Sequence, residues 1–499
     1  MDRTAPTTRM LIGLEIHVQL ATRSKLFCGC AVEFGGPPNS RVCPVCLGMP
    51  GSLPVMNRRA FELAVTTGLA LNCKINRHTK WDRKSYYYPD LPKNYQISQY
   101  DLPLAYEGHF DVPVQGPDGS TSKRVRIRRA HLEEDAGKNI HDIGTTTRVD
   151  LNRTGTPLLE IVTEPDLASA DEAYAFCVEL QRLVTYLGVS EGVMQKGQMR
   201  FEPNVNVVIE ADGVEYRTPI AEIKNLNSFR SVRDAIRYET RRQIDDWQRD
   251  HDYVIKKQPN ENRGWDDERG VTEFQRGKEA AHDYRYFPDP DLAPVEVDEA
   301  LLSDIRRQMP ELPLARRGRF VEQHGLSAAD AETIASERGS ADLFDAAVGL
   351  GAEPRKLTNL FIGPWAAEAN RRGVSLAALG LEPSRIANLV GMWQSNEISA
   401  TSAAVIATKL LDTPSSPREI AQTEGLLMTQ DADQTARWVE EALAANPKAV
   451  QDAISHPKKA QASAGFLRGA VMKLSGGKAD PKLVGDLISR KLAEPSAGQ

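Results

Sequence analysis

The sequence predicts an α+β protein in which a strand-rich first part is followed by helices. Short runs that alternate apolar and polar residues are frequent up to about residue 297, and Ala, Leu and Arg become frequent beyond it. Alternation with a period of two is typical of strands, whereas Ala, Leu and Arg favour helices. At 499 residues the chain is also too long for one hydrophobic core. We therefore expect several domains.

Two proline-rich breaks suggest where these domains meet. The segment FPDPDLAP at 287–294 cannot be helical, and TPSSP at 413–417 interrupts the helical pattern a second time. The expected domains are a strand-rich domain at 1–297, an all-helical domain at 298–412 and a helical tail at 413–499.

Individual elements follow from local patterns. The run LEIHVQL at 14–20 alternates throughout and predicts a strand, as do 124–128 and 205–209. Apolar residues at helical spacing predict a helix after Asn227-Ser228, and Ser231 to Asp234 fits a capping box at its start.

Composition places the chain among ordinary globular proteins. Charged residues make up 26% and the net charge is −6, so any attraction to nucleic acid must come from local patches. The first residues lack the pattern of a secretory signal, and eighteen apolar residues never run together. We expect a cytoplasmic protein without a membrane partner.

Four of the six cysteines are closely spaced, at Cys28, Cys30, Cys43 and Cys46. Cysteine pairs on two tight turns can place four thiolates around Zn²⁺, and the chain has turn-forming residues beside them. The alternative is a catalytic cysteine, but no histidine lies near in sequence. The pattern therefore favours a structural zinc site in a loop of the first domain.

Acidic residues occupy unusual positions in three segments. Glu15 and His17 share one face of their predicted strand, HLEEDAGK at 131–138 crowds three carboxylates, and Glu160 lies inside an apolar run. Each has a simple explanation: a water-facing strand, a solvated turn and an arginine-paired buried glutamate. Together they supply the oxygen and imidazole ligands that suit Mg²⁺ beside a phosphate.

Common nucleotide-binding and hydrolase motifs are missing. The sequence has no Walker A motif, no complete dinucleotide-binding fingerprint, no nucleophile elbow and no HExxH. The tail instead carries scattered basic residues, among them Lys473, Lys478 and Lys482, which suit a nucleic-acid phosphate backbone.

Long motifs resemble the B-subunit family of the aspartyl/glutamyl-tRNA amidotransferase GatCAB. They are GLEIHVQL at 13–20, YYPDLPKNYQISQY at 87–100, HLEEDAGK at 131–138, DLNRTGTPLLE at 150–160, EIKNLNSF at 222–229 and DYRYFP at 283–288. The resemblance runs from about residue 10 to the end, and the tail is similar to the YqeY-like domain of that family. It implies a strand-rich cradle domain at 1–297 and a tRNA-binding tail.

The resemblance also implies an activity and its partners. B subunits of this family use ATP and Mg²⁺ to phosphorylate the side-chain carboxylate of misacylated Glu-tRNA(Gln) or Asp-tRNA(Asn). Ammonia released from glutamine by the amidase A subunit then displaces phosphate to give Gln-tRNA(Gln) or Asn-tRNA(Asn). The implied assembly is a heterotrimer with a small C subunit, and a non-discriminating aminoacyl-tRNA synthetase is a further implied partner.

Site residues carry over by motif. Glu15, His17, Glu134 and Glu160 are the implied catalytic metal ligands, and Glu202 is the fifth, although the family commonly has RCDAN where this chain reads RFEPN at 200–204. We expect Lys93 and Arg153 to contact phosphate, since both lie in loop-like motifs. The family's zinc uses cysteines placed like the four here.

Two other functions fit parts of the pattern. The chain could be a non-catalytic tRNA-binding scaffold in which the acidic residues are structural and the tail alone matters. A stand-alone zinc hydrolase would need an open metal position, which four cysteine ligands would close.

Overall fold

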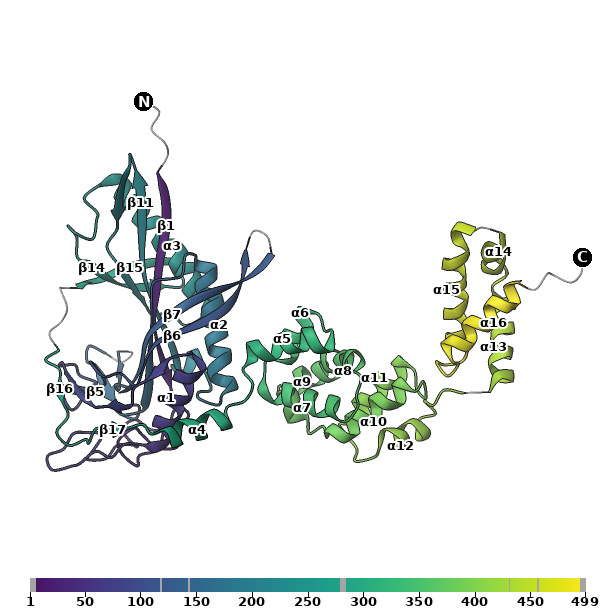
Figure 1. Ribbon diagram of the computed structural model, residues 1–499, viewed down its shortest axis with the longest axis horizontal. Coiled ribbons are helices and arrows are strands. Elements are labelled where there is room, and N and C mark those ends of the chain that lie inside the picture. The colour runs from purple at the N-terminus through teal and green to yellow at the C-terminus, as the bar shows by residue number, and fades with distance from the viewer. Residues whose placement is uncertain are drawn as a thin grey trace, which may run out of the picture. The chain divides into compact units, whose positions relative to one another are not determined.

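The computed structural model describes residues 6–116, 119–141, 144–278, 284–429, 431–455 and 457–493. It divides into two compact units, Met1–Leu312 and Pro313–Gln499 (Figure 1). The first unit is rich in strands and the second is helical, which confirms the predicted α+β class. The predicted boundaries after residues 297 and 412 stay predictions.

The strands of the first unit span the following residues: β1 Thr7–Gln19, β2 Lys74–Ile75, β3 His78–Thr79, β4 Asp82–Ser85, β5 Tyr95–Ser98, β6 Ala105–Gly116, β7 Gly119–Glu134, β8 Lys138–Ile140, β9 Arg148–Asp150, β10 Pro157–Thr163, β11 Met199–Ala211, β12 Val214–Arg217, β13 Ala221–Lys224, β14 Asn260–Asp266, β15 Val271–Lys278, β16 Phe287–Pro288 and β17 Val295–Glu296. Its helices are α1 Arg58–Ala70, α2 Ala170–Tyr186, η1 Met194–Lys196, α3 Phe229–Arg249 and α4 Glu299–Gln308.

A large sheet organises this unit. Among the described residues it has ten strands in the order β15-β14-β13-β11-β1-β10-β7-β6-β2, with β12 paired to β11. The strand predicted at 14–20 corresponds to the second half of β1, which begins at Thr7 and ends at Gln19, and β1 lies at the centre of this order between β11 and β10. A smaller sheet joins β16, β4 and β5. Antiparallel pairing of β1 with both neighbours brings residues far apart in sequence into cross-strand pairs.

One face of the sheet is apolar and carries the core. Leu14, Ile16 and Val18 of β1 are buried on this face, as the alternation of LEIHVQL predicts. Helix α3 covers the same face, since Trp247 packs on Val207 of β11. Figure 1 shows α2 and α3 beside the long strands of the sheet. The opposite face of the sheet therefore holds the polar residues of these strands.

Helix α3 begins directly after Asn227-Ser228, as the sequence predicts, but its cap differs from the predicted one. Ser228 is its N-cap and accepts a hydrogen bond from the backbone N–H of Ser231. The predicted capping box at Ser231 to Asp234 was therefore wrong, because Ser228 already caps the helix and Ser231 lies inside its first turn.

The second unit is built from helices. They are α5 Pro313–His324, α6 Ala328–Ile334, α7 Arg338–Gly349, α8 Pro354–Leu360, the π-helical turn η2 Phe361–Trp365, α9 Ala366–Arg372, η3 Leu376–Leu379, α10 Pro383–Gln394, α11 Ala400–Lys409, α12 Pro417–Thr423, α13 Ala432–Ala445, α14 Pro447–Ser455, α15 Pro457–Leu474 and α16 Pro481–Ala493. The tail helices have their own core, in which Val439, Leu467 and Ile488 are buried together.

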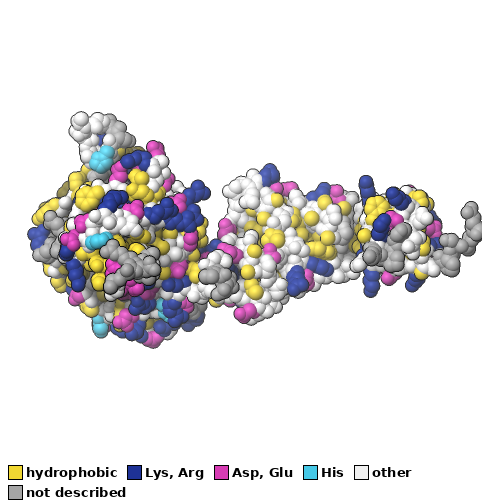
Figure 2. Space-filling view, turned by 90° about the horizontal axis from the view of Figure 1, so that it is seen from above, with side chains coloured by type: hydrophobic (Ala, Val, Ile, Leu, Met, Phe, Trp, Pro, Cys, Tyr) yellow, Lys and Arg dark blue, Asp and Glu magenta, His cyan; other side chains and the backbone are white. Residues whose placement is uncertain are grey.

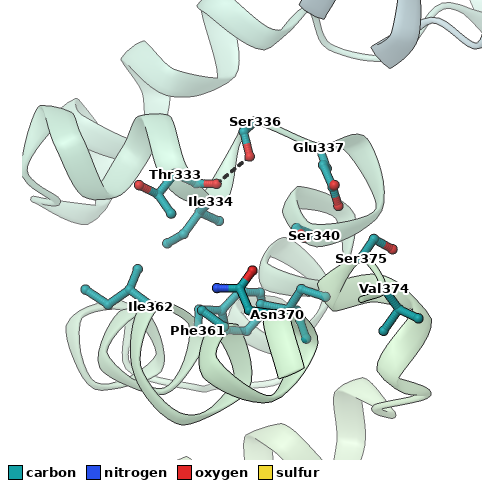
Figure 3. Close-up of a pocket in the computed structure, with 13 residues that line it drawn as sticks. Thr333, Ile334, Ser336, Glu337, Ser340, Phe361, Ile362, Asn370, Val374 and Ser375 are labelled. Carbon is teal, nitrogen blue, oxygen red and sulfur yellow. Dashed lines mark hydrogen bonds between the residues drawn. The ribbon is translucent and has the colours of Figure 1, made fainter. Parts of the chain in front are cut away.

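A cavity of about 160 Å³ lies among α6, α7, η2 and α9 (Figure 3). Side chains such as Ile334, Phe361 and Val374 line it, and within its described lining Glu337 is the single ionisable side chain. These groups provide no acid–base pair or metal ligand set. Along the described ranges, moreover, every helix is too short or too polar to cross a bilayer.

Candidate active site

Five ionisable side chains gather on the polar face of the central strands. Antiparallel register sets His17 of β1 opposite Glu160 of β10, and Glu160 opposite His131 of β7. Glu15 and Glu133 lie two residues along their strands from His17 and His131, so they point to the same face. We call these five residues the acidic cluster.

The side chains of the acidic cluster are close enough to share a cation. His17 Nε2 lies 3.8 Å from Glu15 Oε1, 3.5 Å from Glu133 Oε1 and 3.7 Å from Glu160 Oε2. His131 Nε2 lies 3.5 Å from Glu160 Oε2. Ligand atoms of Glu15, His17 and Glu160 lie within 4.8 Å of one another, and so do those of His131, Glu133 and Glu160.

Burial and mutual repulsion disturb the ionisation of these groups. Burial raises the pKa of Glu15 to about 8, and it raises that of Glu133 to about 8, with the charge of Glu160 adding to both shifts. Burial lowers the pKa of His131 to about 4 and also lowers the pKa of His17. Burial opposes ionisation of Glu160, but the two imidazoles lower its pKa to about 2. Burial and repulsion between the carboxylates thus disfavour full ionisation of the cluster. A bound cation would reduce this electrostatic cost.

Several polar atoms of the acidic cluster have no hydrogen-bond partner within the described structure. Glu133 Oε2 and the Nδ1 atoms of His17 and His131 are buried without a hydrogen bond, although His131 Nε2 lies 3.9 Å from Glu133 Oε2. Buried polar atoms normally have partners. Oxygen ligands of Mg²⁺ lie at about 2.0–2.1 Å from the metal and hence roughly 3–4 Å from one another. The spacing of the cluster and the carboxylate oxygen of Glu133 that lacks a hydrogen bond therefore fit a divalent cation.

Glu134, one of the predicted ligands, does not join the acidic cluster. Its carboxylate pairs with the Lys93 ammonium and accepts a hydrogen bond of 3.1 Å from the backbone N–H of Ile97. Lys93, a predicted phosphate contact, is thereby engaged. The other predicted contact, Arg153, donates to the carbonyl oxygens of Ala136 and Gly137. Through these contacts Lys93 and Arg153 hold the 134–137 segment.

Glu202 lies beside the acidic cluster rather than within it. It stands opposite Glu15 in the pairing of β11 with β1, and its carboxylate accepts a 2.8 Å hydrogen bond from Lys224 Nζ. Its charge contributes to the raised pKa of Glu15. Glu202 therefore extends the negative region of the sheet face toward β13.

Sequence reasoning missed three residues of this site. His131 and Glu133 belong to the quoted HLEEDAGK motif, but their place depends on the register between β7 and β10. Lys84 of β4 is half-buried, and Glu133, Tyr286 and Glu160 raise its pKa against the effect of burial. The strand alternation of 131–134 was an available signal, because it separates Glu133 from Glu134.

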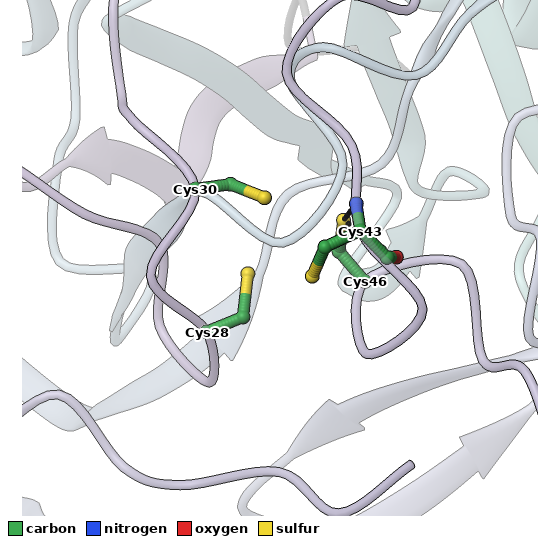
Figure 4. Close-up of side chains that lie close together, drawn as sticks. All are labelled: Cys28, Cys30, Cys43 and Cys46. Carbon is green, nitrogen blue, oxygen red and sulfur yellow. Dashed lines mark hydrogen bonds between the residues drawn. The ribbon is translucent and has the colours of Figure 1, made fainter.

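The four cysteines form a second, separate cluster (Figure 4). Their sulfur atoms lie within 4.8 Å of one another, and all four are free thiols. A tetrahedral zinc site with Zn–S bonds of about 2.3 Å separates its sulfurs by roughly 3.8 Å. The buried ammonium of Lys25 lies 3.7 Å from Cys46 Sγ. Hydrogen bonding with Cys28, aided by Lys25, lowers the pKa of the Cys46 thiol to about 4. This set of donors fits zinc.

The tail lysines predicted to bind tRNA are exposed. Lys473 lies in the last turn of α15, Lys478 in the following loop and Lys482 in the first turn of α16. Figure 2 shows Lys and Arg side chains on the surface of the tail. This placement is compatible with contact to a phosphate backbone.

Comparison with known proteins gives matches along most of the chain. A model described as the GatB/GatE catalytic domain matches residues 10–303, and one described as the GatB domain matches residues 342–492. A protein of Nitratidesulfovibrio vulgaris strain DP4 is 46% identical over 97% of this chain and 98% of its own length. One from Rhodopirellula baltica is 47% identical over 89% of both chains. Both are named as the B subunit of an aspartyl/glutamyl-tRNA(Asn/Gln) amidotransferase.

Proposed function

The chain belongs to the GatB family of amidotransferase B subunits, and from this premise we propose that its acidic cluster holds Mg²⁺ for ATP-dependent activation of the substrate. The family membership makes it a subunit of a tRNA-dependent amidotransferase, which converts Glu-tRNA(Gln) or Asp-tRNA(Asn) to the amidated product. The observation that carries the proposal is the convergence of Glu15, His17 and Glu160 on one face of the sheet.

In this proposal Glu133, rather than the adjacent Glu134, completes the ligand set. Glu133 Oε1 lies 3.5 Å from His17 Nε2 and its other oxygen is buried without a hydrogen bond in the described structure, whereas Glu134 is paired with Lys93. Glu15, His17, Glu160 and Glu133 would hold the cation, with Glu202 at the margin. Mg²⁺ bound there would neutralise the charge of the phosphates during phosphoryl transfer.

Three basic residues near the acidic cluster, Lys84, Lys93 and Arg153, are the proposed contacts for phosphate. Lys84 lies close to the acidic cluster and offers a positive charge to phosphate. Within the described residues its ammonium lies over the Tyr284 ring, 5.1 Å from the ring centroid, and makes no direct ion pair, so it would be able to bind a ligand. Lys93 and Arg153 contact the 134–137 segment, which directly follows Glu133. A phosphate bound there would compete with Glu134 for Lys93 and with backbone carbonyls for Arg153. Because His131, Glu133 and Glu160 are buried, the site would shield an activated carboxylate from water until ammonia arrives.

The proposed assembly assigns ammonia release and carboxylate activation to different subunits. We propose that ammonia comes from an amidase A subunit, that a small C subunit completes a heterotrimer and that the complex works in the cytoplasm. A non-discriminating aminoacyl-tRNA synthetase is a further proposed partner. The four cysteines would hold zinc in a structural role, since four thiolates close the coordination sphere.

The zinc assignment has its own test. Metal analysis of the purified complex should find one zinc per chain, which Cys46→Ser loses and Cys177→Ala keeps, because Cys177 lies in the core of α2 away from the four-cysteine cluster. Equal zinc content in the two variants would reject the site.

The central experiment uses the complete three-subunit enzyme. With misacylated tRNA, ATP and glutamine, Glu160→Gln should abolish ATP-dependent amide formation while tRNA binding is kept. Glu215→Gln is the control, since Glu215 is an exposed residue of β12. Unchanged amidation by Glu160→Gln would reject the catalytic assignment and favour the scaffold function.

A further inference from the structure

Four tyrosine rings line the edge of the site and do not take part in the proposed activation chemistry. Tyr100 stacks on Tyr286 with ring centroids 4.1 Å apart and an angle of 10° between the planes. Tyr284 meets Tyr286 edge-on at 6.0 Å and Tyr86 at 6.0 Å. We call these four residues the tyrosine wall.

The small sheet β16-β4-β5 and the segment beside it position the tyrosine wall. Ser85 N–H donates to the carbonyl oxygen of Tyr284, and Phe287 pairs with Arg83 in the register of β16 and β4. Between Tyr284 and Tyr286, Arg285 adopts the left-handed conformation with φ of 47°. Non-glycine residues avoid this region, and the cost is usually retained where the local geometry serves a site.

The tyrosine wall lies beside strand β7 of the acidic cluster, since Gln99, next to Tyr100, accepts a 3.0 Å hydrogen bond at Oε1 from the backbone N–H of Leu132, which lies between His131 and Glu133. Tyr286 is half-buried; burial raises its pKa to about 12, and the charges of Glu133 and Glu160 add to this shift. Lys84 joins the two features, since its Nζ lies 5.1 Å from the ring centroid of Tyr284 while Glu133 raises its pKa. The wall therefore begins where the substrate carboxylate would be activated.

The outer end of the tyrosine wall is open to solvent. Tyr100 is 56% exposed although one face of its ring lies on Tyr286. Tyr87 and Tyr88, which follow Tyr86 in the chain, are 73% and 59% exposed. Aromatic rings with nearby cations are the surface on which unpaired bases of single-stranded nucleic acid stack.

We propose that the tyrosine wall stacks the unpaired 3′-terminal base of the aminoacyl-tRNA, with Tyr100 as the outermost ring. The inference rests on the proposed function, because it assumes that the aminoacyl carboxylate lies at the acidic cluster. The aminoacyl group is esterified to the terminal ribose, so the base of that nucleotide follows the carboxylate out of the site. A wall that runs from the carboxylates to solvent matches this order.

A strand that arrives from solvent meets the exposed ring of Tyr100 first, and the stack of Tyr100 on Tyr286 then leads inward to the acidic cluster. Stacking is tolerant of base identity, so the wall would hold the tRNA end without reading its sequence.

A fluorescence experiment tests the stacking directly. The complete three-subunit enzyme is mixed with tRNA that carries 2-aminopurine in place of the 3′-terminal adenine, whose fluorescence is quenched when the base stacks. Wild-type enzyme should quench the signal, Tyr100→Phe should keep the quenching and Tyr100→Ala should lose it. Tyr174→Ala is the matched control, since Tyr174 is a 37% exposed tyrosine on α2. Absence of quenching in the wild type, or equal quenching by Tyr100→Ala, overturns the proposal.

Kinetic measurements show whether the base that stacks on the tyrosine wall belongs to the tRNA or to ATP. In the amidation assay Tyr100→Ala should raise the KM for misacylated tRNA by about 5- to 150-fold and leave the KM for ATP unchanged, with Tyr100→Phe near wild type. A raised KM for ATP with an unchanged KM for tRNA overturns the proposal, because the wall would then bind the nucleotide cofactor. Tyr100-dependent quenching by an enzyme that forms no amide would support the wall and reject the proposed function.

Discussion

His17 of β1 and Glu160 of β10 face each other across antiparallel strands, with His17 Nε2 3.7 Å from Glu160 Oε2. The two residues are far apart in the sequence, and only the pairing of the central strands brings them together. Glu15 and Glu133 reach the same imidazole from neighbouring positions of the sheet face. A rigid central sheet thus holds these four groups at the spacing of metal ligands.

The adjacent residues Glu133 and Glu134 should differ in their effect on Mg²⁺. Glu133→Gln should weaken Mg²⁺ binding by at least about tenfold, since loss of even an indirect partner of a metal ligand costs that much. Glu134→Gln should leave Mg²⁺ affinity closer to wild type, because Glu134 is paired with Lys93 outside the acidic cluster. Isothermal titration of the complex with Mg²⁺ measures both; a larger loss for Glu134→Gln would reverse the assignment.

This pair also shows what the sequence could and could not predict. The strand at 14–20, the helical second half and the four-cysteine cluster follow from local patterns that the structure keeps. The face to which Glu133 or Glu134 points depends on the register of β7 against β10, which is set by pairing between distant segments. Lys84 was missed for the same reason, because its neighbours come from other strands.

The effect of Mg²⁺ on thermal stability should depend on pH. The folded-state pKa values of Glu15 and Glu133 are raised to about 8 from the ordinary 4.5, so without metal the folded protein binds more protons than the unfolded chain between these values. Below about pH 6.5 the lowered pKa values of His17 and His131 act in the opposite direction, so in chelator the stability should fall clearly as pH rises from about 6.5 to 8. Mg²⁺ replaces those protons and should raise the Tm more at about pH 8 than at about pH 6. A scan of Tm with and without Mg²⁺ measures this; equal increases at both pH values would contradict it, and a Glu15→Gln/Glu133→Gln double variant is the control.

The cysteine loop should position Lys93 through Gly48. Gly48 has φ of 68°, and a Cβ there would lie 2.5 Å from Lys93 Cγ. Gly51 in the same loop has φ of 83° and open space around its Cβ position. Both Gly48→Ala and Gly51→Ala should lose about 1–2 kcal/mol of unfolding free energy from backbone strain. Gly48→Ala alone should also reduce the amidation rate; the same rate loss in both variants would exclude a role through Lys93.

The tail lysines should contribute charge to tRNA binding. Replacing Lys473, Lys478 and Lys482 by Gln should weaken binding and reduce the slope of log K against log salt by about 2 to 3, if each contacts one phosphate. Lys256→Gln, an exposed lysine of the first unit, is the control. Filter binding at a series of salt concentrations gives the slopes, and a triple variant with the wild-type slope would place the tRNA contacts elsewhere.

The most direct test of the acidic cluster is to locate a bound cation. Crystals of the three-subunit enzyme grown with Mn²⁺ in place of Mg²⁺, together with a non-hydrolysable ATP analogue, would show the metal by its anomalous scattering. We predict a peak in coordination distance of Glu15, Glu160 and Glu133. A peak bound elsewhere, with these three carboxylates making no contact to it, would contradict the assignment of this site.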